Sequence, residues 1–375
     1  MNKTAPARFL ALDVFRGLTV CFMIIVNTPG NSATTFAPLL HAQWHGFTPT
    51  DLVFPSFLFA VGNAIAFVLP RWETMSNSAV LTKILKRTLI IFLLGYLMYW
   101  FPFVKYDGKD FSAFPFSETR VFGVLQRIAL CYGIAATMIW WLKPRATYIL
   151  AVVFLLLYWG ILYWFGDPAD PLSMQGNAGF YLDRWLVGEN HLYHGEGVAF
   201  DPEGLLSTMP AVANVVAGFW AGDLVRRKGT SWETLGLLLL AGVAALFIAY
   251  CWNGVFPVNK KLWTSSFVVL TVGLGANILG AVIYIADIRK KTGWTSFFTV
   301  FGKNPLFIYL LSELIAILLW FFKTPDGTSW YTHLYDLVFS RFGGYIGSFL
   351  FALSIMMICW LAGWWLDRRK IYIRV

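Results

Sequence analysis

The sequence predicts an all-α, polytopic membrane protein, and three observations lead to this fold class. Hydrophobic residues make up 58% of the 375-residue chain and charged residues only 13%. The mean hydropathy is +0.63, which is typical of chains whose solvent is largely lipid. The apolar runs are roughly twenty residues long rather than short and alternating. Helices of that length satisfy their own backbone polar groups within the hydrocarbon, and a β-barrel is excluded.

Ten stretches of roughly 17 to 25 residues each have the length and composition of a helix that spans a bilayer. They begin near Phe9, Asp51, Leu85, Val121, Thr147, Leu206, Leu235, Leu262, Phe297 and Tyr345. The first is not expected to be a cleaved signal peptide, because Asp13 and Arg16 interrupt its apolar core. We expect one integrated transmembrane domain over residues 1–375, with an ordered outer loop region at residues 165–205.

The distribution of basic residues predicts the orientation of the chain, because lysine and arginine accumulate in cytoplasmic loops. With the N-terminus inside, 18 of the 29 basic residues fall in cytoplasmic segments and eight in outer loops. Both termini are therefore predicted to be cytoplasmic, in a bacterial inner membrane, with the outer loops in the periplasm. The net charge of +9 lies in short loops beside helix ends, so nucleic-acid binding is not expected. The loop at residues 165–205 is instead acidic, which suits a cationic ligand such as an amino sugar.

The polar segment from His41 to Asp51 is the strongest candidate for a reactive site, because it joins two apolar spans on the outer side. A neutral imidazole can take a proton from an amine or accept an acyl group near neutral pH. Asn27, at the outer end of the first span, is placed to hold the His41 ring or to donate to an oxyanion. Asp51, Asp201 and Glu203 are candidate orienting or substrate-binding carboxylates.

Metal binding is a weaker interpretation of the same histidines. His41 and His45 are four residues apart, a spacing that brings two imidazoles to one face of a helix. Gly46 and Pro49 favour a loop instead, and no nearby cysteine or second carboxylate completes a ligand set, so no metal is expected. A second group in the outer loop is best interpreted as a hydrogen-bonded surface turn. It comprises Glu189, His191, His194 and Glu196.

Ionisable residues inside the apolar spans cost about 2.5 to 3.5 kcal/mol each on insertion scales and are functional candidates for that reason. Asp13 and Arg16 are three residues apart and can pair on one helical face, either as a structural ion pair or in a functional role. Together with Arg127, Lys303 and Glu313, they are candidates to line a polar path through the bundle.

Eight sequence blocks, in order along the chain, carry a family resemblance. They are residues 12–17, 26–27, 41–55, 123–127, 181–184 with 189–193, 201–204, 257–260 with 262–263, and 303–304 leading to Glu313. On these blocks the chain resembles the heparan-α-glucosaminide N-acetyltransferase family and its bacterial relatives, the transmembrane glucosamine N-acetyltransferases. The blocks extend over roughly residues 9 to 320, and none of them is a generic motif.

The resemblance implies transfer of an acetyl group from cytosolic acetyl-CoA to a glucosamine amine on the far side of the membrane. It places the active-site histidine of the family on His41 and its active-site asparagine on Asn27. This chain has a longer gap between those two residues and is expected to lack the large luminal N-terminal domain of the lysosomal enzymes. A free amino sugar or a short oligosaccharide is therefore the expected acceptor, and a homodimer is left open.

Two mechanisms follow for such a transfer. Either His41 forms an acetyl-imidazole that passes its acetyl group to the amine, or it acts as general base in a direct transfer. We favour direct transfer, since holding both substrates in one site gives the advantage of proximity. The residues expected along the path of the coenzyme are Arg16, Arg127, Lys303 and Asn304, with Arg374 as a weaker candidate.

The alternative function is a secondary transporter for an amino sugar, in which the intramembrane charges relay protons or substrate. Transporters of that kind often have matching broken segments in two halves of the chain, and the sequence shows no such pair. Consumption of acetyl-CoA separates the two functions, since a transporter accumulates unmodified sugar.

Overall fold

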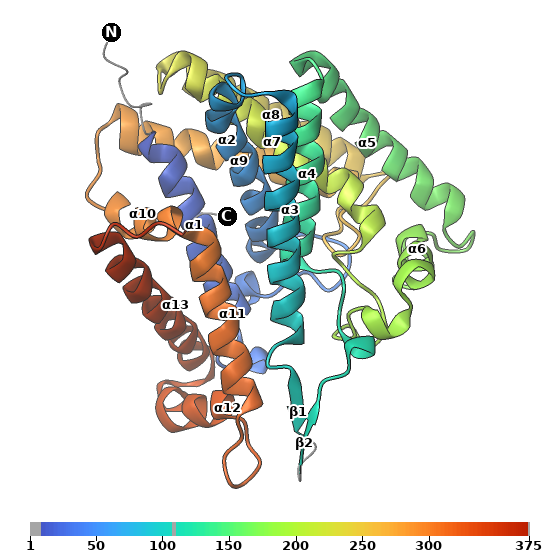
Figure 1. Ribbon diagram of the computed structural model, residues 1–375, viewed down its shortest axis with the longest axis vertical. Coiled ribbons are helices and arrows are strands. Elements are labelled where there is room, and N and C mark those ends of the chain that lie inside the picture. Colours follow the sequence, from blue (N-terminus) through green and yellow to red (C-terminus); the bar gives the residue numbers. More distant parts are fainter. Residues whose placement is uncertain (1–8, 107–109, 374–375) are drawn as a thin grey trace.

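The computed structural model describes residues 9–106 and 110–373. Its described residues form a helical bundle with one small β-hairpin (Figure 1). The helices are α1 (Leu10–Asn27), α2 (Val53–Trp72), α3 (Asn77–Trp100), α4 (Val124–Trp141), α5 (Pro144–Phe165), α6 (Ala178–Val187), α7 (Leu205–Lys228), α8 (Trp232–Asn253), α9 (Ser265–Val282), α10 (Thr295–Lys303), α11 (Pro305–Phe321), α12 (Trp330–Leu334) and α13 (Gly344–Arg368). The hairpin pairs β1 (Val104–Tyr106) with β2 (Phe111–Ala113) in antiparallel register.

The predicted fold class is confirmed, with a difference in the number of spans. Within the described residues, eight helices are long and apolar enough to cross a membrane, and the pair α10 and α11 would make a ninth. That pair is bent by 84° at the break between Lys303 and Pro305. Each of the ten predicted spans overlaps a helix, but α3, the third, is not among the eight. It carries Lys83, Lys86 and Arg87, whose charges oppose burial in lipid.

Helix α7 lies at the centre of the bundle, between α2, α4 and α9 (Figure 1). Its backbone approaches α2 closely because both helices have a glycine at the contact: a Cβ on Gly62 would lie 1.9 Å from the Val215 carbonyl oxygen. A Cβ on Gly218 would likewise lie 1.9 Å from the carbonyl oxygen of Phe59. Small residues at such contacts are the usual means by which helices pack in membranes.

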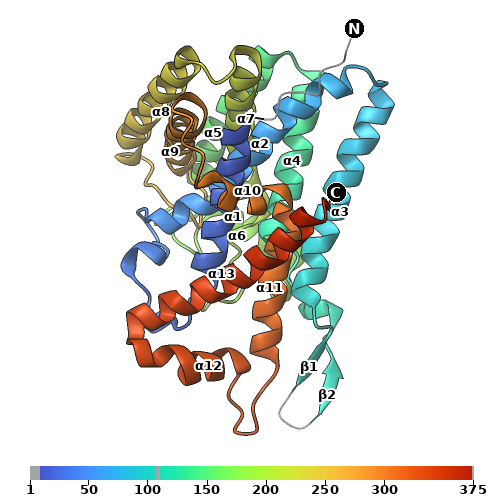
Figure 2. The same ribbon diagram turned by 90° about the vertical axis from the view of Figure 1, so that its left-hand side faces the viewer.

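Helices α5 and α8 lie at the edge of the bundle, as Figures 1 and 2 show. In the most apolar 18 residues of each helix, only 22% of the residues are buried in α5 and 28% in α8, compared with 72% in α7. Their outer faces carry large apolar side chains such as Leu156, Leu240 and Phe247. Such faces are the surface expected against lipid.

The loop region at residues 165–205, between α5 and α7, packs on the bundle. It contains α6, and Phe180 and Phe200 are buried against Tyr158 and Leu162 of α5 and Phe256 of the connection from α8 to α9. The Trp44 indole donates to the Leu172 carbonyl at 3.0 Å. This loop therefore contacts the segment that carries His41.

Candidate active site

The segment from His41 to Thr48 is not helical, and residues Pro49–Leu52 form a short 3-10 turn that leads into α2. This turn carries Asp51 into the protein, where its side chain is fully buried. One carboxylate oxygen, Oδ2, accepts backbone N–H groups from Thr48 at 2.9 Å and Ala42 at 3.2 Å. These two bonds hold the carboxylate in one orientation and leave its other oxygen for a different partner.

That partner is His41, whose Nδ1 lies 2.7 Å from Asp51 Oδ1. A carboxylate in this position accepts the Nδ1 hydrogen and so selects the tautomer in which Nε2 has a free lone pair. The His41 side chain keeps an exposed fraction of 43%, while that of Asp51 is 0%. The pair therefore combines an accessible base with an enclosed orienting group.

Lys260 is the third charged residue at this position, and it comes from the connection between α8 and α9. Its Nζ lies 2.9 Å from Nδ1 and 3.2 Å from Nε2 of His41, and 3.8 Å from Asp51 Oδ1. The backbone N–H of Gly46 donates to the Val258 carbonyl at 2.8 Å, which joins this connection to the His41 segment. The sequence identified Lys260 only as one of the eight basic residues of the outer loops and as part of a family block, because nothing in its local pattern relates it to His41.

The electrostatic surroundings favour a neutral His41. Burial lowers the pKa of the imidazole, and the Lys260 charge lowers it further, against the opposing effects of Asp51 and Glu203. The net direction is below the ordinary histidine value of about 6.5. His41 is therefore in the form that can accept a proton at neutral pH.

Asp201 and Glu203, both predicted as orienting or substrate-binding carboxylates, share one cationic partner. The Arg120 guanidinium donates to both oxygens of Asp201, at 2.9 and 2.7 Å, and to Glu203 at 2.6 Å. The same guanidinium lies over the rings of Tyr99 and Tyr193, with Cζ 4.9 and 4.5 Å from their centroids. Sequence reasoning missed Arg120, which was counted only as one of the outer basic residues.

His41, Asp51 and Lys260 form a group in mutual contact, the His41 group. Glu203 is bonded to Arg120 instead, but its charge acts on His41. Burial works to raise the pKa of Glu203, but the positive charges of Arg120, Arg127 and Lys260 outweigh that effect and leave it below the ordinary value. An ionised Glu203 adds negative charge near Lys260 and His41. Such charge attracts a cationic acceptor.

Asn27 has a different partner from the one expected. Its amide Nδ2 donates to Glu313 Oε1 of α11 at 3.2 Å. Among the hydrogen bonds of the described residues, none joins Asn27 to His41. The link instead connects the C-terminal end of α1 to α11, between residues 286 positions apart.

The four residues expected along the coenzyme path fall in two places. Arg16 pairs with Asp13 at 3.8 Å and donates to the Gly302 carbonyl at 3.2 Å, so it lies beside Lys303 and Asn304. Lys303 contacts the Asp367 carboxylate at 2.6 and 2.7 Å. The Asn304 side chain bonds the backbone of Ile371 and Ile373, and Arg374 lies outside the described residues.

Arg127 stands apart from this group. It is completely buried and donates to the Gly204 carbonyl at 3.2 Å and to the Ser207 hydroxyl, with its guanidinium over the Trp263 ring at 4.7 Å. Its Nε and Nη1 have no hydrogen-bond partner within the described part of the chain, and nor does the side chain of Gln126. The five intramembrane charges thus form separate local groups rather than one line.

The segment from His41 to His45 does not form the helix that a shared metal site would need. The His45 ring contacts Asn259, whose Nδ2 lies 3.4 Å from Nδ1. The outer histidine group is also dispersed: His191 Nδ1 bonds the Thr119 carbonyl at 2.7 Å. Its two glutamates pair with Arg184 and Lys261. The hydrogen-bonded turn fits these contacts better than a ligand set.

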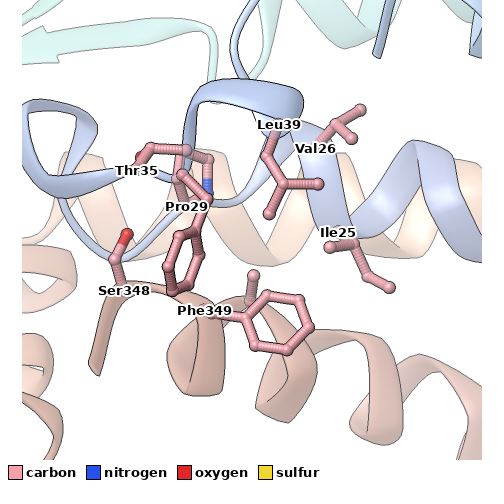
Figure 3. Close-up of a pocket in the computed structure, with 9 residues that line it drawn as sticks. Ile25, Val26, Pro29, Thr35, Leu39, Ser348 and Phe349 are labelled. Carbon is pink, nitrogen blue, oxygen red and sulfur yellow. The ribbon is translucent and has the colours of Figure 1, made fainter. Parts of the chain in front are cut away.

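A small pocket lies between the C-terminal end of α1, the segment that follows it and α13 (Figure 3). Its lining includes Ile25, Val26, Leu39 and Phe349, and none of its lining residues is titratable. None of the residues His41, Asp51 and Lys260 lines this pocket, so it is separate from the candidate active site.

The fold and the site define a polytopic helical membrane protein that presents an aspartate-oriented histidine on an inter-helix segment. A family model described as "Heparan-alpha-glucosaminide N-acetyltransferase, catalytic" matches residues 8–187. The human heparan-alpha-glucosaminide N-acetyltransferase is 27% identical, over 88% of this chain and 56% of the relative. The mouse protein of the same name is 26% identical, over 84% and 54%. These matches confirm the family resemblance, and the chain spans about half the length of the curated relatives it matches.

Proposed function

We propose that this protein is a membrane-embedded N-acetyltransferase. It moves an acetyl group from cytosolic acetyl-CoA to the amine of glucosamine, or of a glucosamine-terminated saccharide, across a bacterial inner membrane. Both termini lie in the cytoplasm and the His41 segment faces the periplasm. The observation that carries the proposal is the 2.7 Å contact of His41 Nδ1 with the buried Asp51 carboxylate. The names of the relatives support the reaction type.

The proposed chemistry is direct transfer with His41 as the base. The acceptor loses its ammonium proton to water and reacts as the free amine. This amine attacks the thioester carbon, and one of its two N–H protons passes to Nε2 of His41 as the C–N bond forms. Asp51 stabilises the resulting imidazolium through Nδ1–H. The C–S bond then breaks, and the imidazolium returns the proton to the departing thiolate. In the second route the same nitrogen, Nε2, acts as nucleophile and forms an acetyl-imidazole. Only this route transfers the label of radiolabelled acetyl-CoA to His41, so a search for labelled His41 distinguishes the two.

Acetyl-CoA is the co-substrate of this scheme, and its thioester supplies the activated acetyl group. Arg16, Lys303 and Asn304 are proposed to bind its charged nucleotide near the cytoplasmic end, where they already lie together. Arg127 is proposed to meet the pantetheine arm. Two of its buried guanidinium nitrogens have no partner among the described residues, and buried donors of that kind are costly unless an acceptor reaches them. Asp51, Asp201 and Glu203 supply the negative charge that attracts the amino sugar.

The experiment that tests the function uses the purified protein in detergent with radiolabelled acetyl-CoA and glucosamine. Labelled N-acetylglucosamine is the expected product. The break between α10 and α11 favours one alternative, an amino-sugar transporter, since broken helices form the sites of many transporters. Uptake of unmodified glucosamine into liposomes, with no acetyl-CoA consumed, would establish that alternative and refute the acetyltransferase.

Asp51→Asn is expected to lower kcat about 100-fold. Two backbone N–H groups donate to Oδ2, so the amide oxygen of the variant should stay there and its NH₂ should face His41 Nδ1. Nδ1 must then accept, and Nε2 carries the hydrogen, which is the wrong tautomer for a base. The measurement is kcat at saturating substrates. Asp326→Asn, in the turn at residues 324–328, is the control and should keep the wild-type rate. A folded Asp51→Asn enzyme of normal kcat would contradict the orienting role.

A further inference from the structure

The Lys260 ammonium lies over the face of the His41 ring. Its Nζ is 2.9 Å from Nδ1 and 3.2 Å from Nε2. A position in the ring plane that close to both nitrogens would overlap Cε1, which lies between them, so Nζ must be above or below the plane. The lone pair of Nε2 lies in the plane. It is therefore directed away from Lys260 and open to an acceptor amine.

Lys260 is held there by protein contacts and by charge. Its side chain keeps an exposed fraction of only 17%, with Asp51 Oδ1 at 3.8 Å. Burial lowers the pKa of Lys260, whereas the charges of Asp51, Glu203 and Glu196 raise it and that of Lys261 lowers it. A positive charge over the imidazole disfavours imidazolium in the resting site. The charged groups that act on the His41 ring are Lys260, Asp51 and Glu203.

We propose that Lys260 is a catalytic residue whose ammonium stabilises the oxyanion formed when the acceptor amine attacks the thioester. This proposal rests on the proposed function. An amine that gives its proton to Nε2 lies about 3 Å from that nitrogen, and the carbonyl carbon is one forming bond further on. The carbonyl oxygen then lies within reach of Nζ, which is itself 3.2 Å from Nε2. Negative charge develops on this oxygen as the C–N bond forms and disappears when the C–S bond breaks, and Lys260 keeps its protons throughout.

The position of Asn27 supports this assignment. The amide of Asn27, the candidate oxyanion donor from the sequence, donates to Glu313 instead. The described residues in direct contact with the His41 ring nitrogens are Asp51, which is an acceptor, and Lys260. Of the two, Lys260 alone is a donor that can stabilise an oxyanion. A preorganised cation at that place acts where the substrate charge develops.

The test is the pH dependence of kcat for Lys260→Met and Lys260→Arg beside the wild type. Lys260→Met is expected to lower the plateau of kcat about 100-fold, the typical effect of losing one oxyanion donor. It should also move the acid limb to higher pH, because loss of the positive charge raises the pKa of His41. Lys260→Arg should keep the acid limb and most of the plateau. In the wild type we expect a basic limb where Lys260 loses its proton, because burial lowers the pKa of Lys260. Lys260→Arg should lack this limb, since arginine does not titrate in this range.

Lys261→Met is the matched control. Lys261 is the next residue and pairs with Glu196 of the outer loop instead of the His41 ring, so its removal should leave the plateau and both limbs in place. An unchanged plateau and acid limb in Lys260→Met would overturn the proposal, as would equal loss of activity in both Lys260 variants with no displaced limb. If Lys260→Met does not fold, the basic limb of Lys260→Arg decides. Absence of acetyl transfer by the wild type would instead refute the underlying function.

Discussion

Replacing His41 with alanine is expected to lower kcat for acetyl transfer about 10³- to 10⁴-fold, near the upper end of the range for general acid–base catalysis. The His41 ring presents Nε2 as the accessible base, while its Nδ1 lies 2.7 Å from the Asp51 carboxylate. Its loss removes the base for the attacking amine and the acid for the departing thiolate in one change. Because the side chain is 43% exposed, the alanine variant leaves little buried space and should fold normally.

The measurement is N-acetylglucosamine formation by purified protein at saturating acetyl-CoA and glucosamine. His45→Ala is the control, since His45 belongs to the same segment and contacts Asn259 at 3.4 Å rather than Asp51. It should retain most of the wild-type rate. Imidazole added to the His41→Ala variant should restore part of the activity if the missing group is a base. Wild-type turnover by a folded His41→Ala protein would remove this residue from the mechanism.

Arg120→Leu is expected to have the largest effect on stability, a loss of about 3 kcal/mol or more in the free energy of unfolding. Arg120 contacts Asp201 through two nitrogens and Glu203 through one, and the exposed fraction of the Asp201 side chain is 0%. Leucine in place of Arg120 leaves two enclosed carboxylates without their cation. Removing one partner of a buried ion pair costs far more than the pair contributes when intact, because the remaining charge is desolvated and unpaired.

The measurement is thermal unfolding in detergent at neutral pH, where a drop of several degrees is expected. Arg184→Leu is the matched control: Arg184 pairs with Glu189 at 2.7 Å, but both side chains are more than half exposed. Its loss should change stability by less than about 1 kcal/mol. Equal midpoints for the two variants would show that the Arg120 group is solvated in the native protein.

The membrane class and the contact between His41 and Asp51 were predictable from local features. Composition and run length determine that a chain folds in lipid, because each helix must satisfy its own backbone there. His41 and Asp51 lie ten residues apart in one short connection, so their proximity follows from the chain itself. The number of membrane-spanning helices was less predictable. Three charged residues keep α3 out of the set of eight, and the break at Asn304 divides one apolar run of the sequence into two helices.

The partners of those residues depend on packing between distant segments. Lys260 reaches His41 over 219 positions, Arg120 reaches Asp201 over 81, and Asn27 reaches Glu313 over 286. Helical periodicity identifies which residues lie on one face of a helix, but not which other helix that face meets. By itself, the sequence determined a multi-pass helical membrane protein with a histidine and a carboxylate on one loop. Only the tertiary structure decided that Lys260 lies over the His41 ring and that Arg120 pairs with Asp201 and Glu203, because those contacts form when distant segments pack together.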